Sequence, residues 1–130
     1  AYGTQIVLKT IDTPDGQITY YRAITVTATS YSPCNSGVSE CLYGTALGLP
    51  VQKGVIAVHL AWYRFLKGTK MYVPGYGIGT IADTGSYPYN SNWIDLGYTD
   101  AEFALYGKFY PSITVYLMAP APANVPGIMP

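Results

Sequence analysis

Asp83 and Asp95 are the residues of this 130-residue chain whose types and surroundings best suit acid chemistry. Asp83 follows the strand-like run Ile78 to Ala82 and directly precedes Thr84-Gly85, while Asp95 follows the short apolar run Trp93-Ile94. A carboxylate at a strand end, beside a glycine that lets a substrate approach, is a common position for a catalytic acid. Burial and a second nearby carboxylate both raise a carboxyl pKa, so we expect Asp83 to be the acid and Asp95 its partner.

Other interpretations of Asp83 and its neighbourhood stay open. Asp83 could instead cap a turn through Thr84 and Gly85 as an Asx motif. Gly85 is expected to leave room for a substrate or to serve a turn. Tyr87, Tyr89 and Trp93, in the loop that joins the two aspartates, are candidates for stacking on a sugar, and packing is an equally good account of each.

His59 is the only histidine, and it follows the buried-strand run Val55 to Val58. It could be hydrogen-bonded to Asp83 or Asp95, act as a proton-relay partner that titrates at about pH 6 to 7, or only pack. A protonated His59 beside Asp83 would lower the pKa of that aspartate. One histidine and two aspartates could hold a metal ion, but the chemistry considered below needs none, and we expect no metal site.

Composition excludes several function classes. Charged residues make up 11% of the chain and balance to zero, which argues against nucleic acid and anionic membranes as partners. No apolar run is long enough to span a membrane. No phosphate-binding or dinucleotide fingerprint is present, so no cofactor is expected. No signal peptide is recognisable, and because the chain starts at Ala1 inside a strand-like pattern, we expect a piece of a longer precursor.

The two cysteines, Cys34 and Cys41, lie in the short polar segment CNSGVSEC. Two cysteines without nearby histidines or further cysteines make a poor zinc site. We therefore expect a Cys34–Cys41 disulfide, which indicates an extracytoplasmic protein.

The remaining pattern is one of short strands separated by glycine-containing turns. A hairpin is expected where Thr-Pro-Asp-Gly joins two β-rich runs. In the run Thr25 to Tyr31 the alternate residues make one face rich in threonine. Thr99 and Glu102 form a capping box for one short helix that ends near Tyr106. The expected strands are Gln5–Ile11, Gln17–Arg22, Thr25–Tyr31, Val55–Val58, Lys70–Val73, Ile78–Ala82 and Ser112–Met118.

The segments GVIAVH, KMYVPGYG, IADTGS and WIDLG, in this order, resemble the 3D domain, a family named for three aspartates. The resemblance covers about Thr25 to Leu117. Asp83 and Asp95 match two of the three aspartates, and Thr45 matches the first threonine of the family's T-A-T-G motif. Three positions depart from the pattern: Leu47 replaces the second threonine, His59 the first aspartate and Leu60 the proline after it.

The resemblance implies a mainly β fold, a six-stranded double-psi β-barrel with an N-terminal hairpin and one short helix. It divides the chain into residues 1–24, a hairpin similar to the end of a G5 module; residues 25–118, the barrel; and residues 119–130, a Pro-rich tail or linker. Asp83, Asp95 and His59 are then expected to converge in one cleft, with Thr45 and His59 near the substrate.

Related barrels occur in membrane-bound lytic transglycosylase A, where the aspartate that Asp83 matches is the catalytic acid, and in rare lipoprotein A. The implied function is a secreted domain that cleaves peptidoglycan glycan strands with one Asp acid/base. The alternative is a non-catalytic module that binds peptidoglycan or another polysaccharide, or a structural module of a surface protein. The expected partner is peptidoglycan or another cell-wall polysaccharide, and we expect a monomer.

Overall fold

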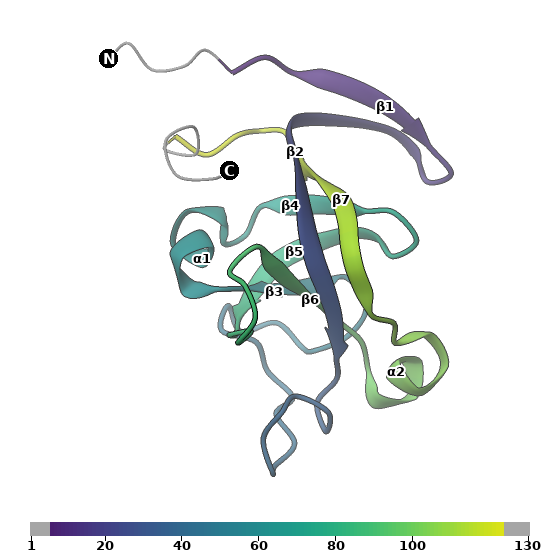
Figure 1. Cartoon of the computed structure of the whole chain (residues 1–130), viewed down its shortest axis with the longest axis vertical. Helices are drawn as coiled ribbons and strands as arrows, with labels where there is room; N and C mark the ends of the chain where they lie inside the picture. The colour runs from purple at the N-terminus through teal and green to yellow at the C-terminus, as the bar shows by residue number, and fades with distance from the viewer. Residues whose placement is uncertain (1–5, 124–130) are drawn as a thin grey trace.

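The computed structural model describes residues 6–123, which form seven strands and two short helices (Figure 1). In chain order the elements are β1 (Lys9–Thr13), β2 (Gly16–Tyr31), β3 (Val55–Val58), α1 (Leu60–Leu66), β4 (Lys70–Val73), β5 (Gly77–Thr84), β6 (Trp93–Gly97), α2 (Asp100–Tyr106) and β7 (Tyr110–Met118). Part of the expected tail, residues 124–130, lies outside the described residues, as do residues 1–5.

Six of the strands form a closed barrel. The strand order is β1-β2-β6-β3-β5-β4-β7, and a further pairing of β2 with β7 closes the sheet and leaves β1 as the extra strand. The pairs β2/β6 and β3/β5 are parallel, and the others are antiparallel. The expected mainly β, six-stranded barrel is therefore confirmed, and the mixed topology is compatible with a double-psi barrel.

Strand β2 covers the length of two expected strands. Sequence patterns indicated separate strands over Gln17–Arg22 and Thr25–Tyr31, but the structure has one continuous strand with register shifts against β7. Its first part pairs with β1 around the turn at Gly16, where φ is 106°, and its second part pairs with β6 and β7. The hairpin thus continues directly into the barrel and projects beyond one end of it (Figure 1).

Alternation along the strands fills the barrel interior. Ile24, Val26 and Ala28 of β2 are buried in the barrel interior. The threonines that alternate with them, Thr25, Thr27 and Thr29, point to the opposite face of the strand. Fully buried residues from the other strands complete this core: Ile56, Val58, Met71, Val73, Ile81, Ile94, Leu96, Val115 and Leu117.

Two helices are present where one was expected. Helix α2 starts at the capping box of Thr99 and Glu102 and ends at Tyr106, as the sequence indicated. Helix α1 was missed, because its aromatic composition carries no capping signal. Its Trp62 and Leu66, four residues apart, lie on one face and are both buried in the core. Tertiary packing therefore stabilises this short helix.

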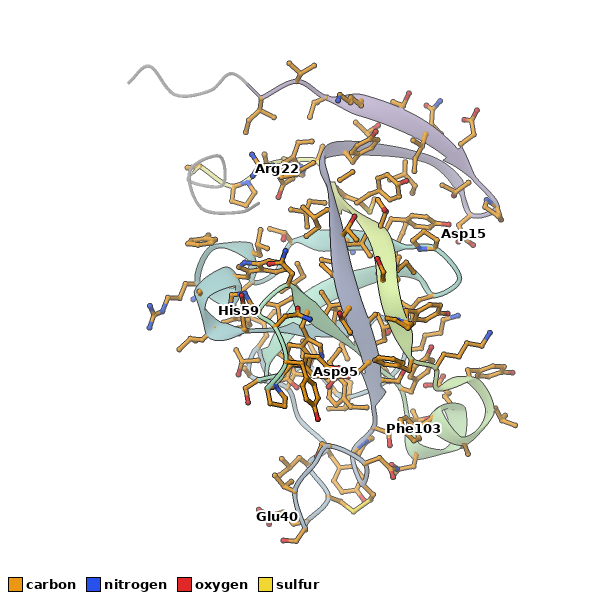
Figure 2. The ribbon with its side chains drawn as sticks, in the orientation of Figure 1. Asp15, Arg22, Glu40, His59, Asp95 and Phe103 are labelled. Carbon is orange, nitrogen blue, oxygen red and sulfur yellow. A yellow bond between two sulfur atoms is a disulfide. The ribbon has the colours of Figure 1, made fainter. Side chains whose placement is uncertain are left out.

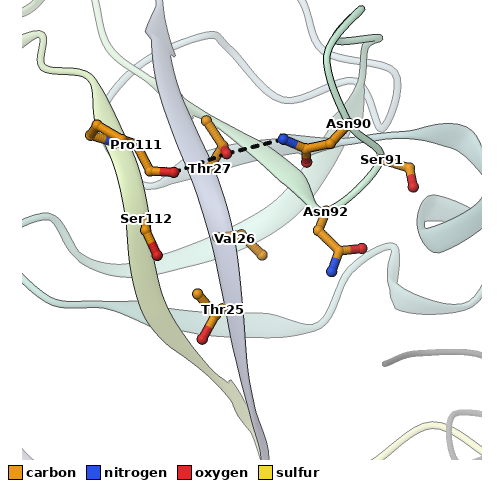
Figure 3. Close-up of a pocket in the computed structure, with 8 residues that line it drawn as sticks. All are labelled: Thr25, Val26, Thr27, Asn90, Ser91, Asn92, Pro111 and Ser112. Carbon is orange, nitrogen blue, oxygen red and sulfur yellow. Dashed lines mark hydrogen bonds between the residues drawn. The ribbon is translucent and has the colours of Figure 1, made fainter.

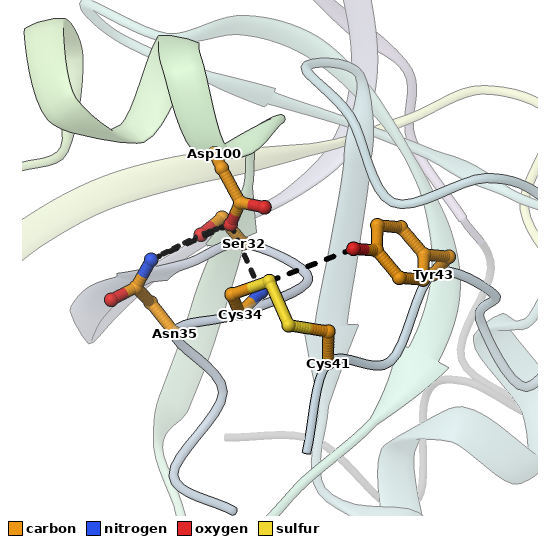
Figure 4. Close-up of a disulfide and its surroundings, with 6 residues drawn as sticks. All are labelled: Ser32, Cys34, Asn35, Cys41, Tyr43 and Asp100. Atoms are coloured by element: carbon orange, nitrogen blue, oxygen red, sulfur yellow. Dashed lines mark hydrogen bonds between the residues drawn. A yellow bond between two sulfur atoms is a disulfide. The ribbon is translucent and has the colours of Figure 1, made fainter. Parts of the chain in front are cut away.

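Residues 32–54, between β2 and β3, form a long segment that we call the covering loop (Figure 1). The expected Cys34–Cys41 disulfide is confirmed within it. The Asp100 carboxylate of α2 accepts hydrogen bonds from Ser32 Oγ at 2.6 Å and from the Cys34 backbone N–H at 2.9 Å (Figure 4). The disulfide therefore constrains the loop internally, and the charge-assisted hydrogen bonds to Asp100 hold the start of the loop against α2.

A glycine is required where β6 passes the start of β3. A Cβ on Gly97 would lie 2.5 Å from Val55 Cγ2 and 2.7 Å from the Val55 carbonyl oxygen. We predict that Gly97→Ala lowers the free energy of unfolding by about 1–3 kcal/mol, because a backbone oxygen cannot move aside cheaply. Gly44→Ala is the matched control, since a Cβ on Gly44 would have no other atom within 4 Å and neither glycine has positive φ. Urea unfolding of the oxidised proteins measures both, and equal losses would contradict the packing argument.

Candidate functional site

The two aspartates lie in one row of side chains that crosses four strands. Asp95 of β6 pairs with Thr29 of β2 on one side and with Ala57 of β3 on the other. Ala57 in turn pairs with Asp83 of β5. Directly paired residues project to the same face of a sheet. Asp83 and Asp95 therefore share a face, with only the small Ala57 side chain between them.

A β-bulge in β5 gives Asp83 this orientation. Ile56 pairs with Ile81, but Ala57 pairs with Asp83, so Ala82 is an extra residue in β5. Without the extra residue Asp83 would pair with Val58, whose side chain is fully buried in the barrel interior. The bulge is itself tied to the covering loop, because the Ala82 carbonyl accepts a hydrogen bond from the Leu47 N–H at 2.9 Å.

A cleft of about 460 Å³ lies between this row and the covering loop. Tyr31, Val51 and Ala57 form a small apolar cluster in its wall, separate from the barrel core. The cleft is lined by Tyr31, Ala57, Asp83, Thr84, Gly85, Ser86, Trp93 and Asp95 from the barrel side and by Ser36, Gly37, Val38, Leu42, Gly44 and Val51 from the covering loop. Its volume suits a small-molecule or saccharide unit.

Asp83 is held by three hydrogen-bond donors. Its Oδ2 accepts from the Tyr31 hydroxyl at 2.9 Å, and its Oδ1 accepts from the backbone N–H groups of Ala46 at 3.0 Å and Thr84 at 2.9 Å. The bond from Thr84 is the local contact expected of a turn-capping aspartate. Burial and the Asp83 charge both raise the pKa of Tyr31, which therefore stays a protonated donor at neutral pH.

Asp95 has a different environment. Its Oδ1 accepts a hydrogen bond of 2.8 Å from Thr29 Oγ1, which in turn accepts one of 2.8 Å from Trp93 Nε1. Because an indole N–H only donates, the Thr29 hydroxyl proton is directed to Asp95. Burial raises the pKa of Asp95 to about 7; the bond from Thr29 opposes the rise and the charge of Asp83 adds to it.

Asp95 is therefore the carboxyl group whose pKa the structure raises toward neutrality. The sequence suggested that Asp83 is the acid and Asp95 raises its pKa. In the structure burial raises the pKa of Asp95 to about 7, so part of this carboxyl is protonated at neutral pH, whereas the Asp83 carboxyl accepts three hydrogen bonds from the protein. The pairing was anticipated, and the geometry favours the opposite assignment of roles.

His59 is not among the residues that line the cleft. It precedes α1, and its ring contacts the Trp62 ring with centroids 4.8 Å apart. Its Nε2 is buried without a hydrogen-bond partner among residues 6–123, and burial lowers its pKa. Figure 2 shows His59 at the start of α1 and Asp95 on β6. Of the three interpretations, packing agrees best with this environment.

Thr45 and Gly85 support the site in different ways. Thr45 is buried, and its Oγ1 accepts a hydrogen bond from the Leu49 N–H at 3.0 Å, which places the neighbouring Ala46 N–H on Asp83. Gly85 lines the cleft, and a Cβ on it would lie 2.7 Å from Trp93 Cη2. Thr45 therefore positions a loop, and Gly85 allows close packing of an indole.

The three aromatic residues of the joining loop form a stack. Trp93 is buried, although it lines the cleft, and Tyr87 lies parallel to it with centroids 5.8 Å apart. Tyr89 meets Tyr87 edge-on and is 80% exposed. Tyr89 is thus the member of the stack with the most surface free for a ligand.

Sequence reasoning did not single out Thr29, Tyr31 or Ser36 as site residues. Thr29 and Tyr31 lie on the threonine-rich face that the sequence pattern reveals. That face was the sequence feature from which these two site residues could have been predicted. Ser36 Oγ is buried in the covering loop without a partner among residues 6–123, and no sequence pattern marked it. Within the same range, no group of three His, Cys, Asp or Glu side chains could hold a metal ion.

The raised pKa of Asp95 predicts how stability depends on pH. The native state keeps this proton up to about pH 7, while the unfolded chain loses it near pH 4, so its contribution to stability is complete below about pH 4 and is lost as pH rises through 7. In Asp95→Asn this loss of stability at high pH is absent, because an amide does not titrate. Relative to wild type, the variant should gain up to about 4 kcal/mol between pH 4 and pH 8, as an upper bound. Urea unfolding at both pH values tests this, and Asp15→Asn in the exposed β1–β2 turn, which should show no such gain, is the control. A gain that is absent or of opposite sign would contradict the assignment.

No protein-family model matches this chain, and no curated protein matches it in sequence. The functional conclusion therefore rests on the cleft itself and on the order of the motifs around it.

Proposed function

We propose that this chain is a secreted, cell-wall-active domain that cleaves peptidoglycan glycan strands in a reaction of the lytic transglycosylase type. The observation that carries the proposal is the carboxyl pair in the cleft, in which Asp95 has a pKa of about 7 and Asp83 lies close enough to raise it. Two carboxyl groups in unequal environments are the usual arrangement for acid catalysis at a glycosidic bond.

In this mechanism Asp95 acts first as acid and then as base. Protonated Asp95 gives its proton to the glycosidic oxygen as the bond from C1 to that oxygen breaks, and the leaving saccharide departs with a free hydroxyl. Positive charge develops at C1. The sugar's own 6-hydroxyl then attacks C1 and returns its proton to Asp95, which restores the enzyme. No water is consumed, so one acid/base group suffices.

Asp83 acts in this scheme as a fixed negative charge. Tyr31 and two backbone N–H groups hold its carboxylate in place. That charge stabilises the positive charge at C1, and it adds to the burial that raises the pKa of Asp95. The bonds that hold Asp83 exist before substrate binds, so no reorganisation is needed during the reaction.

Two further observations support a location at the cell wall. The Cys34–Cys41 disulfide is typical of proteins in oxidising, extracytoplasmic compartments. The order of motifs resembles the 3D domain, and the barrel is compatible with that fold. Among residues 6–123, no helix is long and apolar enough to cross a membrane.

A non-catalytic module that binds peptidoglycan or another wall polysaccharide is the second candidate. It is favoured by one observation: both oxygens of Asp83 are already bonded within the protein, as in a purely structural turn. The two candidates differ in whether the chain releases products from wall material.

We predict that Asp95→Asn lowers the release of anhydro-sugar products from purified peptidoglycan by at least about 100-fold, because an amide cannot supply and retake the proton. Asp83→Asn should lower it less. Asp15→Asn controls for the loss of one negative charge far from the cleft. Wild-type rates in Asp95→Asn would remove its acid role. If wild type and variants all lack activity but all sediment with insoluble peptidoglycan, the binding module is favoured instead.

The pH profile separates the roles of the two aspartates. Since the acid must be protonated in the free enzyme, kcat/KM of wild type should fall above about pH 7 with the slope of a single proton. Asp83→Asn should shift this fall to lower pH, because the charge that raises the pKa of Asp95 is gone. A profile that Asp83→Asn leaves unmoved would contradict the electrostatic coupling of the pair.

A further inference from the structure

A second hollow, which we call the polar groove, lies on the outer face of the barrel near the cleft. Its volume is about 320 Å³. Strand β2 forms its floor, the loop residues Asn90, Ser91 and Asn92 form one side, and Pro111 and Ser112 of β7 form the other (Figure 3). The proposed reaction makes no use of this groove.

The lining of the polar groove is neutral and rich in hydrogen-bonding groups. No Asp, Glu, Lys or Arg lines it. Thr27 Oγ1 accepts from Asn90 Nδ2 at 3.2 Å and donates to the Pro111 carbonyl at 3.1 Å, so it joins the two sides. These bonds fix the shape of the groove before any ligand binds.

Three side chains of the groove remain available to a ligand. The side chains of Ser91, Asn92 and Ser112 make no hydrogen bond with other residues in the described range 6–123. The backbone of Asn92 is nevertheless anchored, because its carbonyl accepts a 2.9 Å hydrogen bond from the Thr27 N–H. A fixed backbone that carries an unpaired amide is suited to recognition, since the amide both donates and accepts.

The polar groove and the cleft share one face of β2. Thr25 and Thr27 line the groove, and Thr29 contacts Asp95 two residues further along. Two residues of extended strand span about 6.6 Å. The loop that carries Asn90 to Asn92 also carries the exposed Tyr89, whose aromatic stack ends on Trp93 in the cleft wall. A chain of linked sugars could therefore follow β2 from one hollow to the other.

We propose that the polar groove is a second saccharide subsite, in which a neutral N-acetylated sugar of the same glycan strand binds beside the one at Asp95. Hydroxyl and acetamide groups need both donors and acceptors, which Asn92 and Ser112 supply. A charged peptide or phosphate would call for a cation that the lining lacks. The inference rests on the proposed function for its ligand class, and its test is independent of catalysis.

The test is binding of oligomers of β-1,4-linked N-acetylglucosamine, from two to six sugars, followed by calorimetry and by NMR of the Asn92 side-chain amide. Wild type should bind longer oligomers more tightly than the dimer. The double variant Asn92→Ala/Ser112→Ala should lose this gain and bind the hexamer about tenfold more weakly, as expected for one or two lost neutral hydrogen bonds. Gln52→Ala, an exposed amide that lines neither hollow, is the matched control and should bind as wild type does.

The outcomes keep this inference apart from the proposed function. Length-dependent binding that the double variant loses supports the subsite, even if wild type releases no product from peptidoglycan. Equal hexamer affinity in wild type and the double variant overturns it, even if Asp95-dependent cleavage is found. Absence of binding by every oligomer, or an Asn92 amide signal that no oligomer shifts, also overturns it.

Discussion

The extra residue at Ala82 is the constraint on which the site depends. Side chains alternate along a strand, so a single inserted residue decides whether Asp83 faces the barrel interior or the cleft. Inside the barrel, among fully buried residues such as Ile56 and Val58, an aspartate without partners would be strongly destabilising. On the outer face it meets Tyr31 and two backbone donors. The Ala82 carbonyl in the same bulge accepts a hydrogen bond from Leu47 of the covering loop. The bulge therefore both orients the Asp83 carboxylate and helps to hold the loop in place.

The carboxyl groups of Asp83 and Asp95 differ in the hydrogen bonds that they accept. Asp95 receives one side-chain hydrogen bond, the last link of the chain Trp93–Thr29–Asp95, and burial raises its pKa to about 7. Asp83 receives three hydrogen bonds. The small Ala57 between them keeps them near enough to interact and leaves the space over the row open. Acid catalysis at neutral pH requires a group whose pKa lies near that pH, as the pKa of Asp95 does.

The covering loop converts this row into a cleft. Its residues supply the opposite wall, and the loop has almost no regular structure of its own. The Cys34–Cys41 disulfide constrains the loop internally. The hydrogen bonds to Asp100 hold its start, and its hydrogen bonds with Asp83 and Ala82 hold a later part of it. On the far side of the row, β2 continues to the polar groove, so one strand connects both hollows. Stability and the proposed recognition of a glycan therefore depend on the same backbone.

The sequence by itself determined the strand-rich architecture, the hairpin, the capped helix α2 and the disulfide, and it singled out Asp83 and Asp95 as candidates. These follow from local signals: alternation, turn residues, a capping box and two isolated cysteines close together. Only the tertiary structure raised the pKa of Asp95, because desolvation depends on every chain segment packed around a group. It also placed His59 against Trp62 and outside the cleft lining, brought Tyr31 to Asp83, and stabilised α1 through the core burial of Trp62 and Leu66. Each of these depends on contacts between residues far apart in the chain or on the solvent exposure that such contacts set, and local patterns record neither.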